Sequence, residues 1–136
     1  MIKMYTQSSA VVFSRLGDTA HAIEDATAVM RFEPANAAAL GVRADAYTAK
    51  GDFEHAIDDY SAAIHFAPEY VLYVQRGIAY RLKGDREHAI DDFYKAINAR
   101  PLASDDARAE LKKLGVEVPA NREVVPPGKT LLDVLK

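Results

Sequence analysis

Apolar residues recur along this chain at helical spacing. In the stretch 53–66 they follow the pattern i, i+3, i+4, i+7, i+10, i+11, at Phe53, Ala56, Ile57, Tyr60, Ala63 and Ile64. This spacing places them on one face of an α-helix, whereas a strand would alternate apolar and polar residues. Gly51 and Asp52 precede the stretch and Pro68 follows it. Because glycine closes helices, aspartate caps them and proline stops them, these residues predict the helix boundaries.

The pattern repeats at a nearly fixed period. The Gly-Asp pair at 51–52 has copies at 17–18 and 84–85, at steps of 34 and 33 residues. A second helical stretch precedes each pair, so each period holds two helices joined by a tight corner, which makes them antiparallel. A period of this length is typical of stacked helical repeats that together bury one continuous core. The chain is therefore predicted to be all-α.

Small residues and aromatic rings occupy equivalent positions in the copies. The small residues are Ala10, Ala44 and Gly77 in the first helices and Ala22, Ala56 and Ala89 in the second helices. The rings are Phe13, Tyr47 and Tyr80 in the first helices and Tyr60 and Phe93 in the second helices. Small side chains let helix axes approach to the short end of the usual range of about 8–10 Å, and the rings fill the space beside them.

These positions resemble the tetratricopeptide repeat (TPR) family. The second unit supplies its pattern with Leu40, Ala44, Tyr47, Ala56, Tyr60, Ala63 and Pro68. The third unit supplies it with Tyr73, Gly77, Tyr80, Ala89, Phe93, Ala96 and Pro101. The first unit is degenerate, because Thr6 and Ala26 replace bulky residues.

The resemblance implies a right-handed α-solenoid of three units followed by a cap and a tail. The expected parts are unit one at 3–34, unit two at 35–68, unit three at 69–101, a capping helix at 102–115 and an extended tail at 116–136. In the capping helix, Ser104 is the predicted N-cap. Its inward residues are predicted to be Ala107, Leu111 and Leu114, and its water-facing residues Arg108, Glu110, Lys112 and Lys113.

The tail ends in a short apolar segment. Its apolar residues are Leu131, Leu132, Val134 and Leu135. An isolated helix of this length is unstable unless it packs on something. We therefore expect the segment to dock on its own solenoid or on a second copy, and a frayed terminus is the alternative.

Composition removes several classes of function. The chain has no cysteine, which excludes disulfides and thiol catalysis, and its net charge of −3 gives no case for binding nucleic acid. No apolar stretch reaches the roughly 18 residues of a membrane span, and the N-terminus lacks the apolar block of a signal peptide. No membrane insertion is expected, and the cytoplasm is the default compartment.

The repeated histidines and acidic pairs do not predict catalysis. His21, His55 and His88 are equivalent residues, and adjacent repeats hold such residues too far apart to share one metal ion. The acidic pairs are Glu24-Asp25, Asp58-Asp59 and Asp91-Asp92. Neighbours on a helix do not face each other, so these pairs are predicted to be a solvated stripe and not a carboxylate dyad. No enzyme motif, metal site or cofactor is predicted.

The resemblance further implies that the first helices line a groove that binds peptides. One TPR subgroup grips chaperone carboxylates with lysine, asparagine and arginine, and this chain instead has Gln7, Val11, Val42, Val71 and Gln75 at those positions. A carboxylate would lose its water there without compensation, so that function is rejected. The candidate groove residues are Val11, Arg15, Val42, Asp45, Val71, Val74, Gln75, Ile78, Arg81 and Leu82.

Val74, Ile78 and Leu82 are predicted to form an apolar stripe that folding does not need, which marks a binding site. The alternative is that the stripe packs against a facing helix. The leading hypothesis is a non-enzymatic adaptor that binds an apolar or amphipathic peptide of a protein partner. A self-associating scaffold, a homodimer formed by tail exchange, is the second hypothesis, and a regulatory subunit of an enzyme is the third.

Overall fold

A computed structural model describes residues 18–118 of the chain. Within that range there are six α-helices and no strand, so the all-α prediction is confirmed. The helices are α2 (Thr19–Phe32), α3 (Ala37–Lys50), α4 (Phe53–Phe66), α5 (Tyr70–Lys83), α6 (Arg86–Ala99) and α7 (Asp105–Lys113). The predicted first helix of unit one and the predicted apolar tail segment lie outside the described residues.

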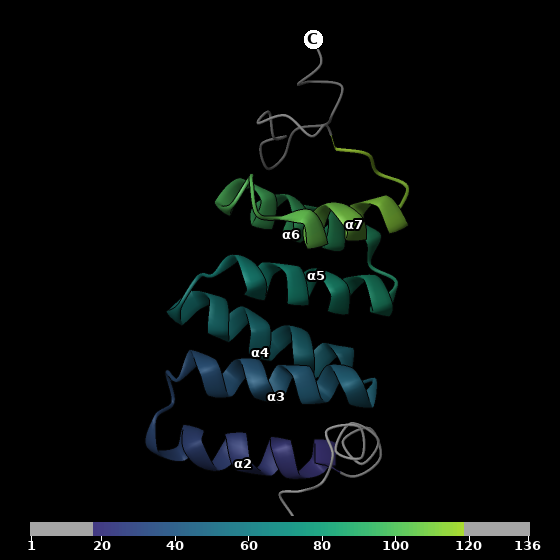
Figure 1. The fold of residues 1–136 in the computed structure, drawn as a ribbon. Helices are drawn as coiled ribbons and strands as arrows, with labels where there is room; N and C mark the ends of the chain where they lie inside the picture. The colour runs from purple at the N-terminus through teal and green to yellow at the C-terminus, as the bar shows by residue number, and fades with distance from the viewer. Residues whose placement is uncertain (1–17, 119–136) are drawn as a thin grey trace, which may run out of the picture. The chain divides into compact units, whose positions relative to one another are not determined.

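The chain divides into two compact units, Met1–Phe66 and Ala67–Lys136. In the first unit, α3 packs against both α2 and α4, and the three helices run back and forth (Figure 1). In the second unit, α5 packs along α6, and α7 packs mainly on α6 with a smaller contact to α5. Each unit therefore contains one complete antiparallel helix pair, α3–α4 or α5–α6.

The Gly-Asp corners form as the sequence predicts. Gly51 and Gly84 adopt left-handed backbone conformations, with φ of 89° and 96°. Residues other than glycine rarely adopt such backbone angles, which explains why glycine closes α3 and α5. The next residue caps the following helix: Asp52 Oδ1 accepts a hydrogen bond from the His55 backbone N–H at 3.3 Å, and Asp85 does the same in the copy.

The two first helices begin differently. The Asn36 side chain accepts a hydrogen bond from the Ala39 backbone N–H at 2.9 Å, which satisfies one of the free donors at the start of α3. The equivalent residue before α5 is Glu69, whose side chain makes no capping bond. Only α3 therefore has a side-chain cap among these two helices.

Small residues and rings meet as expected in both helix pairs. In the first unit, Ala44 and Ala56 are fully buried and the Tyr60 side chain is 2% exposed. In the second unit, Gly77 is buried against the Phe93 ring, and a Cβ atom placed at Gly77 would lie only 2.6 Å from Phe93 Cε1. The Phe93 ring therefore limits the size of the residue at position 77.

The last helix completes the core of the second unit. Ala107 and Leu111 of α7 are fully buried, and Leu114, Val116 and Val118 pack at the edge of the same cluster. The prediction for Glu110 is wrong, because this residue is buried and does not face water. Its carboxylate accepts a hydrogen bond from Arg81 Nε of α5 at 2.9 Å and another from Lys113 at 2.8 Å, which compensates for the lost hydration.

Ser104 stands at the N-cap position of α7 but makes no side-chain capping bond. Its hydroxyl is buried without a hydrogen-bond partner in the described part of the chain. The prediction that the Ser104 side chain caps this helix is therefore wrong, although the helix begins at the expected residue.

Candidate functional site

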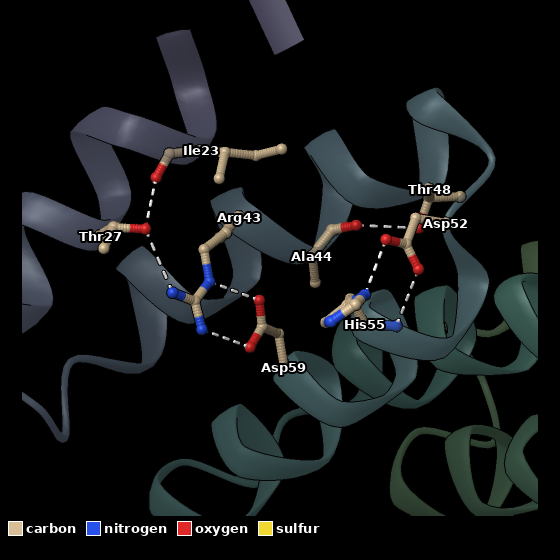
Figure 2. Close-up of polar contacts among 8 residues, drawn as sticks. All are labelled: Ile23, Thr27, Arg43, Ala44, Thr48, Asp52, His55 and Asp59. Atoms are coloured by element: carbon tan, nitrogen blue, oxygen red, sulfur yellow. Dashed lines mark hydrogen bonds and ion pairs between the residues drawn. The ribbon is translucent and has the colours of Figure 1, made fainter. Parts of the chain in front are cut away.

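A buried ion pair links the helices of the first unit (Figure 2). Arg43 of α3 donates two hydrogen bonds to the Asp59 carboxylate of α4, from Nε at 2.6 Å and from Nη2 at 2.7 Å. Its Nη1 also reaches the Thr27 hydroxyl of α2 at 3.2 Å, and Thr27 in turn donates to the Ile23 carbonyl. One guanidinium therefore joins α2, α3 and α4.

The second unit repeats the pair. Arg76 of α5 donates to Asp92 of α6 from Nε at 2.8 Å and from Nη2 at 2.7 Å. The guanidinium carbon lies 5.8 Å from the centre of the Tyr73 ring and 5.9 Å from that of Tyr80. The hydrogen bond to Asp92 raises the pKa of the Arg76 guanidinium. The rings and the charge together hold Arg76 in one orientation.

These pairs correct the prediction of a solvated acidic stripe. Asp59 is 6% exposed and Asp92 is 1% exposed, whereas Asp58 is exposed and Asp91 lies at the surface in an ion pair with Lys95. Sequence reasoning missed the arginines. Arg43 and Arg76 both lie on the inward face of the first helix of a pair, 16 residues before the aspartate that each one binds. An arginine repeated at equivalent positions is the sequence signal that could have predicted the ion pairs.

The repeated histidines belong to the corners. His55 and His88 are exposed, and the Nδ1 atom of each lies 2.7 Å from a carboxylate oxygen of the capping aspartate. Their rings stack on Tyr47 and Tyr80, with centroids 5.1 and 5.0 Å apart. Within residues 18–118 no cluster of His, Cys, Asp or Glu has the arrangement of a metal site.

Four of the predicted groove residues on α5 share one face. Val71, Gln75, Ile78 and Leu82 follow one another at spacings of four, three and four residues, which returns to the same side of a helix. Val71 is 40% exposed and Leu82 is 46% exposed at the two ends of this face, which we call the α5 stripe. Gln75 and Ile78 are partly exposed between them.

Val74 does not belong to the α5 stripe. It is 5% exposed and is part of the core cluster with Phe93 and Ile97. The predicted series Val74, Ile78 and Leu82 is therefore wrong at its first member, because Val74 lies on the side of α5 that faces α6. Arg81 is also engaged, since it binds the carboxylate of Glu110.

The equivalent face of α3 is more polar. Its residues are Ala38, Val42, Asp45 and Ala49, which are all exposed. Val42 is 52% exposed, and the Asp45 carboxylate accepts a hydrogen bond from the Tyr60 hydroxyl of α4. Burial raises the pKa of the Tyr60 phenol, with the hydrogen bond to Asp45 contributing, so Tyr60 is a neutral donor near neutral pH.

Two cavities between α2 and α3 extend from Val42. The larger has a volume of about 440 Å³ and the smaller about 230 Å³. A further cavity of about 600 Å³ lies in the second unit, between the start of α5 and the end of α6. Val71 forms part of its wall, and Arg100 lies with its guanidinium carbon 5.1 Å from the Tyr70 ring centre at the same place. The α5 stripe therefore opens into a cavity at its N-terminal end.

Several of the predicted site residues lie outside the part of the chain that the structure describes. Val11 and Arg15 of the groove, and Leu131, Leu132, Val134 and Leu135 of the tail, lie outside the described residues. Among the helices that the structure describes, none combines the length and the apolar character needed to cross a membrane.

Comparison with known proteins identifies the repeat. A family model described as tetratricopeptide repeat matches residues 37–70 and again residues 70–101. These matches cover the α3–α4 and α5–α6 pairs. A search of curated proteins found no match to the chain.

Proposed function

The chain belongs to the tetratricopeptide repeat family, and on that premise we propose that it binds an apolar or amphipathic segment of a partner protein through the α5 stripe. Tetratricopeptide repeats are protein–protein interaction modules, and the family is generally a non-enzymatic scaffold. The family thus gives the general role, and the residues of α5 suggest the chemistry of the ligand.

The observation that carries the proposal is the exposure of Val71 and Leu82. The core of the second unit is built from other residues, among them Val74, Phe93 and Ile97. Large apolar side chains that folding does not bury, and that lie in line on one helix face, are typical of a binding surface. The stripe is about three turns long, because its first and last residues are 11 positions apart.

The stripe favours a helical or extended ligand with apolar side chains. A partner helix can present residues at intervals of three and four to match Val71, Ile78 and Leu82. Gln75 supplies a hydrogen-bonding amide in the middle of this apolar surface. The cavity beside Val71 can receive one larger side chain, and the exposed Arg100 at its wall favours an acidic residue there.

The test is site-specific photo-crosslinking in the cells that make the protein. A photo-reactive phenylalanine is placed at Val71, Gln75 or Leu82, and at the exposed α6 residues Glu87 and Asn98 as controls. The stripe positions should capture the same protein, and the α6 positions should not. Equal capture from stripe and control positions would contradict the proposal.

The apolar C-terminal segment is the competing ligand for this stripe. In the adaptor hypothesis, segment 131–135 occupies the stripe when no partner is present; in the scaffold hypothesis, the segment comes from a second copy. Sedimentation of the full chain and of a chain ending at Gly128 separates the two. A dimer formed only by the full chain supports the scaffold, whereas two monomers support the adaptor.

A further inference from the structure

A basic and an acidic residue line the cavity at the N-terminal end of the α5 stripe without pairing with each other. This cavity of about 600 Å³ lies between the start of α5 and the end of α6, and its walls include Glu69 and Arg100. Both residues are exposed, and neither forms an ion pair with another residue in the range 18–118. Both charges are therefore available to a ligand that enters the cavity.

The Arg100 side chain is held over the ring of Tyr70. Its guanidinium carbon lies 5.1 Å from the ring centre, which is within the range of a cation–π contact. Tyr70 packs against the core cluster of the second unit, so the surface beneath the guanidinium is anchored. The Arg100 backbone is anchored as well, because its N–H donates to the Ala96 carbonyl at 3.1 Å and its carbonyl accepts from the Ala103 N–H at 3.2 Å. The positive charge is thus positioned at the cavity wall before a ligand binds.

The α3–α4 pair has no counterpart of this contact. By the repeat period of 33 residues, Ala37 is equivalent to Tyr70 and Ala67 is equivalent to Arg100. Neither the ring nor the charge exists at those positions. Since both helix pairs share the Gly-Asp corner, the His–Tyr stack and the Arg–Asp ion pair, a pair of this kind folds without the contact between Tyr70 and Arg100.

We propose that Tyr70 and Arg100 form a charge-selecting subsite, which binds an acidic side chain at one end of the partner segment. This inference rests on the proposed function, because the α5 stripe holds the apolar part of the same segment. A carboxylate in the cavity gains the charge and the N–H donors of Arg100, whereas a basic residue is repelled there. In a helical segment, the acid should lie within about one turn of the residue that packs on Val71, because Val71 and Arg100 line one cavity. The subsite thus fixes the register of the segment along the stripe.

Glu69 acts in the opposite direction. Its carboxylate lines the same cavity and repels an incoming acid. Substitutions that neutralise Glu69 or Arg100 should therefore have opposite effects on the affinity for one ligand. A basic residue at the C-terminal end of α6 also stabilises that helix through the dipole, but this role alone would not produce opposite effects on binding.

The test uses peptides selected from a random library of segments about 16 residues long, which as helices exceed the three turns of the stripe. The full chain is the bait, and the chain with Val71→Asp and Leu82→Arg is the counter-selection. The surviving peptides are those that need the stripe. We expect them to share Asp or Glu at one position near an end. One of these peptides is then synthesised, and its affinity for each variant is measured by fluorescence anisotropy.

Arg100→Gln should weaken binding of this peptide about three- to fivefold, as the loss of a partly exposed ion pair implies, and Arg100→Lys should retain most of the affinity. Glu69→Gln should strengthen binding about twofold. The effect of Arg100→Gln should shrink as salt is added, because exposed charges are screened. The matched control is Lys112→Gln, which removes one positive charge from the exposed side of α7 and should change little.

The outcomes separate this inference from the proposed function. Stripe-dependent peptides without a shared acid, or equal effects of Arg100→Gln and Lys112→Gln, would overturn the subsite and leave the proposed function intact. Weaker binding after both Arg100→Gln and Glu69→Gln would also overturn it, because the two residues would then only shape the cavity. A library that yields no stripe-dependent peptide would overturn the proposed function and this inference with it.

Discussion

The α3–α4 and α5–α6 pairs share one framework but present different surfaces. Both pairs have a Gly-Asp corner, a histidine stacked on a tyrosine and an arginine bound to a buried aspartate. They differ at two positions that face each other across the pair. Asp45 and Tyr60 form a hydrogen bond in the first, whereas Ile78 and Phe93 replace them in the second.

The exchange of Asp45 for Ile78 removes the charged residue of the face, and the exchange of Tyr60 for Phe93 removes its buried hydrogen-bond partner, while both helix pairs keep the same fold. Because Ile78 replaces Asp45, the hydroxyl of a tyrosine at position 93 would have no hydrogen-bond acceptor. Phenylalanine at this position leaves no buried polar group unsatisfied. Val71 and Leu82 also enlarge the apolar surface, since they replace Ala38 and Ala49, whereas Gln75 replaces Val42 and runs in the opposite direction. The α5 face is consequently the one suited to apolar ligands.

The largest expected effect comes from removing one member of the more deeply buried ion pair. Arg76→Met leaves the carboxylate of Asp92, whose side chain is 2% exposed, without its partner and should cost about 3–5 kcal/mol in the free energy of unfolding. Arg43→Met should cost less, because the Asp59 side chain is 8% exposed and can regain some water. Denaturant titration of both variants measures the difference.

The double variant Arg76→Met, Asp92→Leu is the control for that comparison. It removes both charges, so most of the lost stability should return. A double variant as unstable as Arg76→Met alone would show that packing, and not the unmatched charge, causes the loss.

A second comparison concerns the small residue against the ring. Gly77→Ala should destabilise the chain by about 1–3 kcal/mol, because the new Cβ atom would meet the Phe93 ring. The cost should fall when Phe93→Leu is added, since the shorter side chain leaves room. Chemical unfolding of the single and double variants tests this coupling, and strictly additive effects would contradict it.

The helix starts give a smaller contrast. Asn36→Ala removes the cap of α3 and should cost about 1 kcal/mol, whereas Glu69→Ala before α5 should cost little. Glu69→Asn adds the missing cap and should be stabilising. The unfolding midpoints of the three variants measure these effects. An equal loss of stability from both alanine substitutions would show that the Asn36 cap contributes no stability.

The smallest effect concerns pH. The hydrogen bond from the His88 backbone N–H holds the pKa of Asp85 below its ordinary value. The stability that this carboxylate contributes is therefore present above the unfolded-state pKa of about 3.9 and is lost as the pH falls through the lower folded-state value. Asp85→Asn removes the titration, so the melting temperature should fall less between pH 5 and pH 3 than it does in the unchanged chain. Parallel profiles would contradict this assignment.

The elements of the fold were predictable because they depend on local chemistry. At the two described corners, Gly51 and Gly84 act through backbone conformation and Asp52 and Asp85 through capping, and both effects reach only a few residues. The buried ion pairs were not predictable in the same way. Asp59 looks like a surface acid in its own helix, and its partner Arg43 lies 16 residues earlier on another helix.

Which of the selected α5 residues share one exposed face was predictable only in part. Val71, Gln75, Ile78 and Leu82 were all selected from the sequence, and they lie on one side of α5. Val74 satisfied the same apolar spacing with Ile78 and Leu82, yet it faces α6. Spacing alone does not say which of two adjacent apolar rows is inward, because that depends on how α5 is rotated against Phe93 and Ile97.

The most direct test of the α5 stripe as the binding surface is the crosslinking yield of a chain with the photo-reactive residue at Gln75 and the paired substitutions Val71→Asp and Leu82→Arg. These charges suit the helix dipole, because the acid lies in the first turn of α5 and the base in the last, and both sites are exposed. The helix should therefore stay folded while the stripe loses its apolar ends. We predict that partner capture falls at least about tenfold, as the loss of two buried apolar contacts implies. Undiminished capture by the folded variant would contradict the assignment of the α5 stripe as the binding surface.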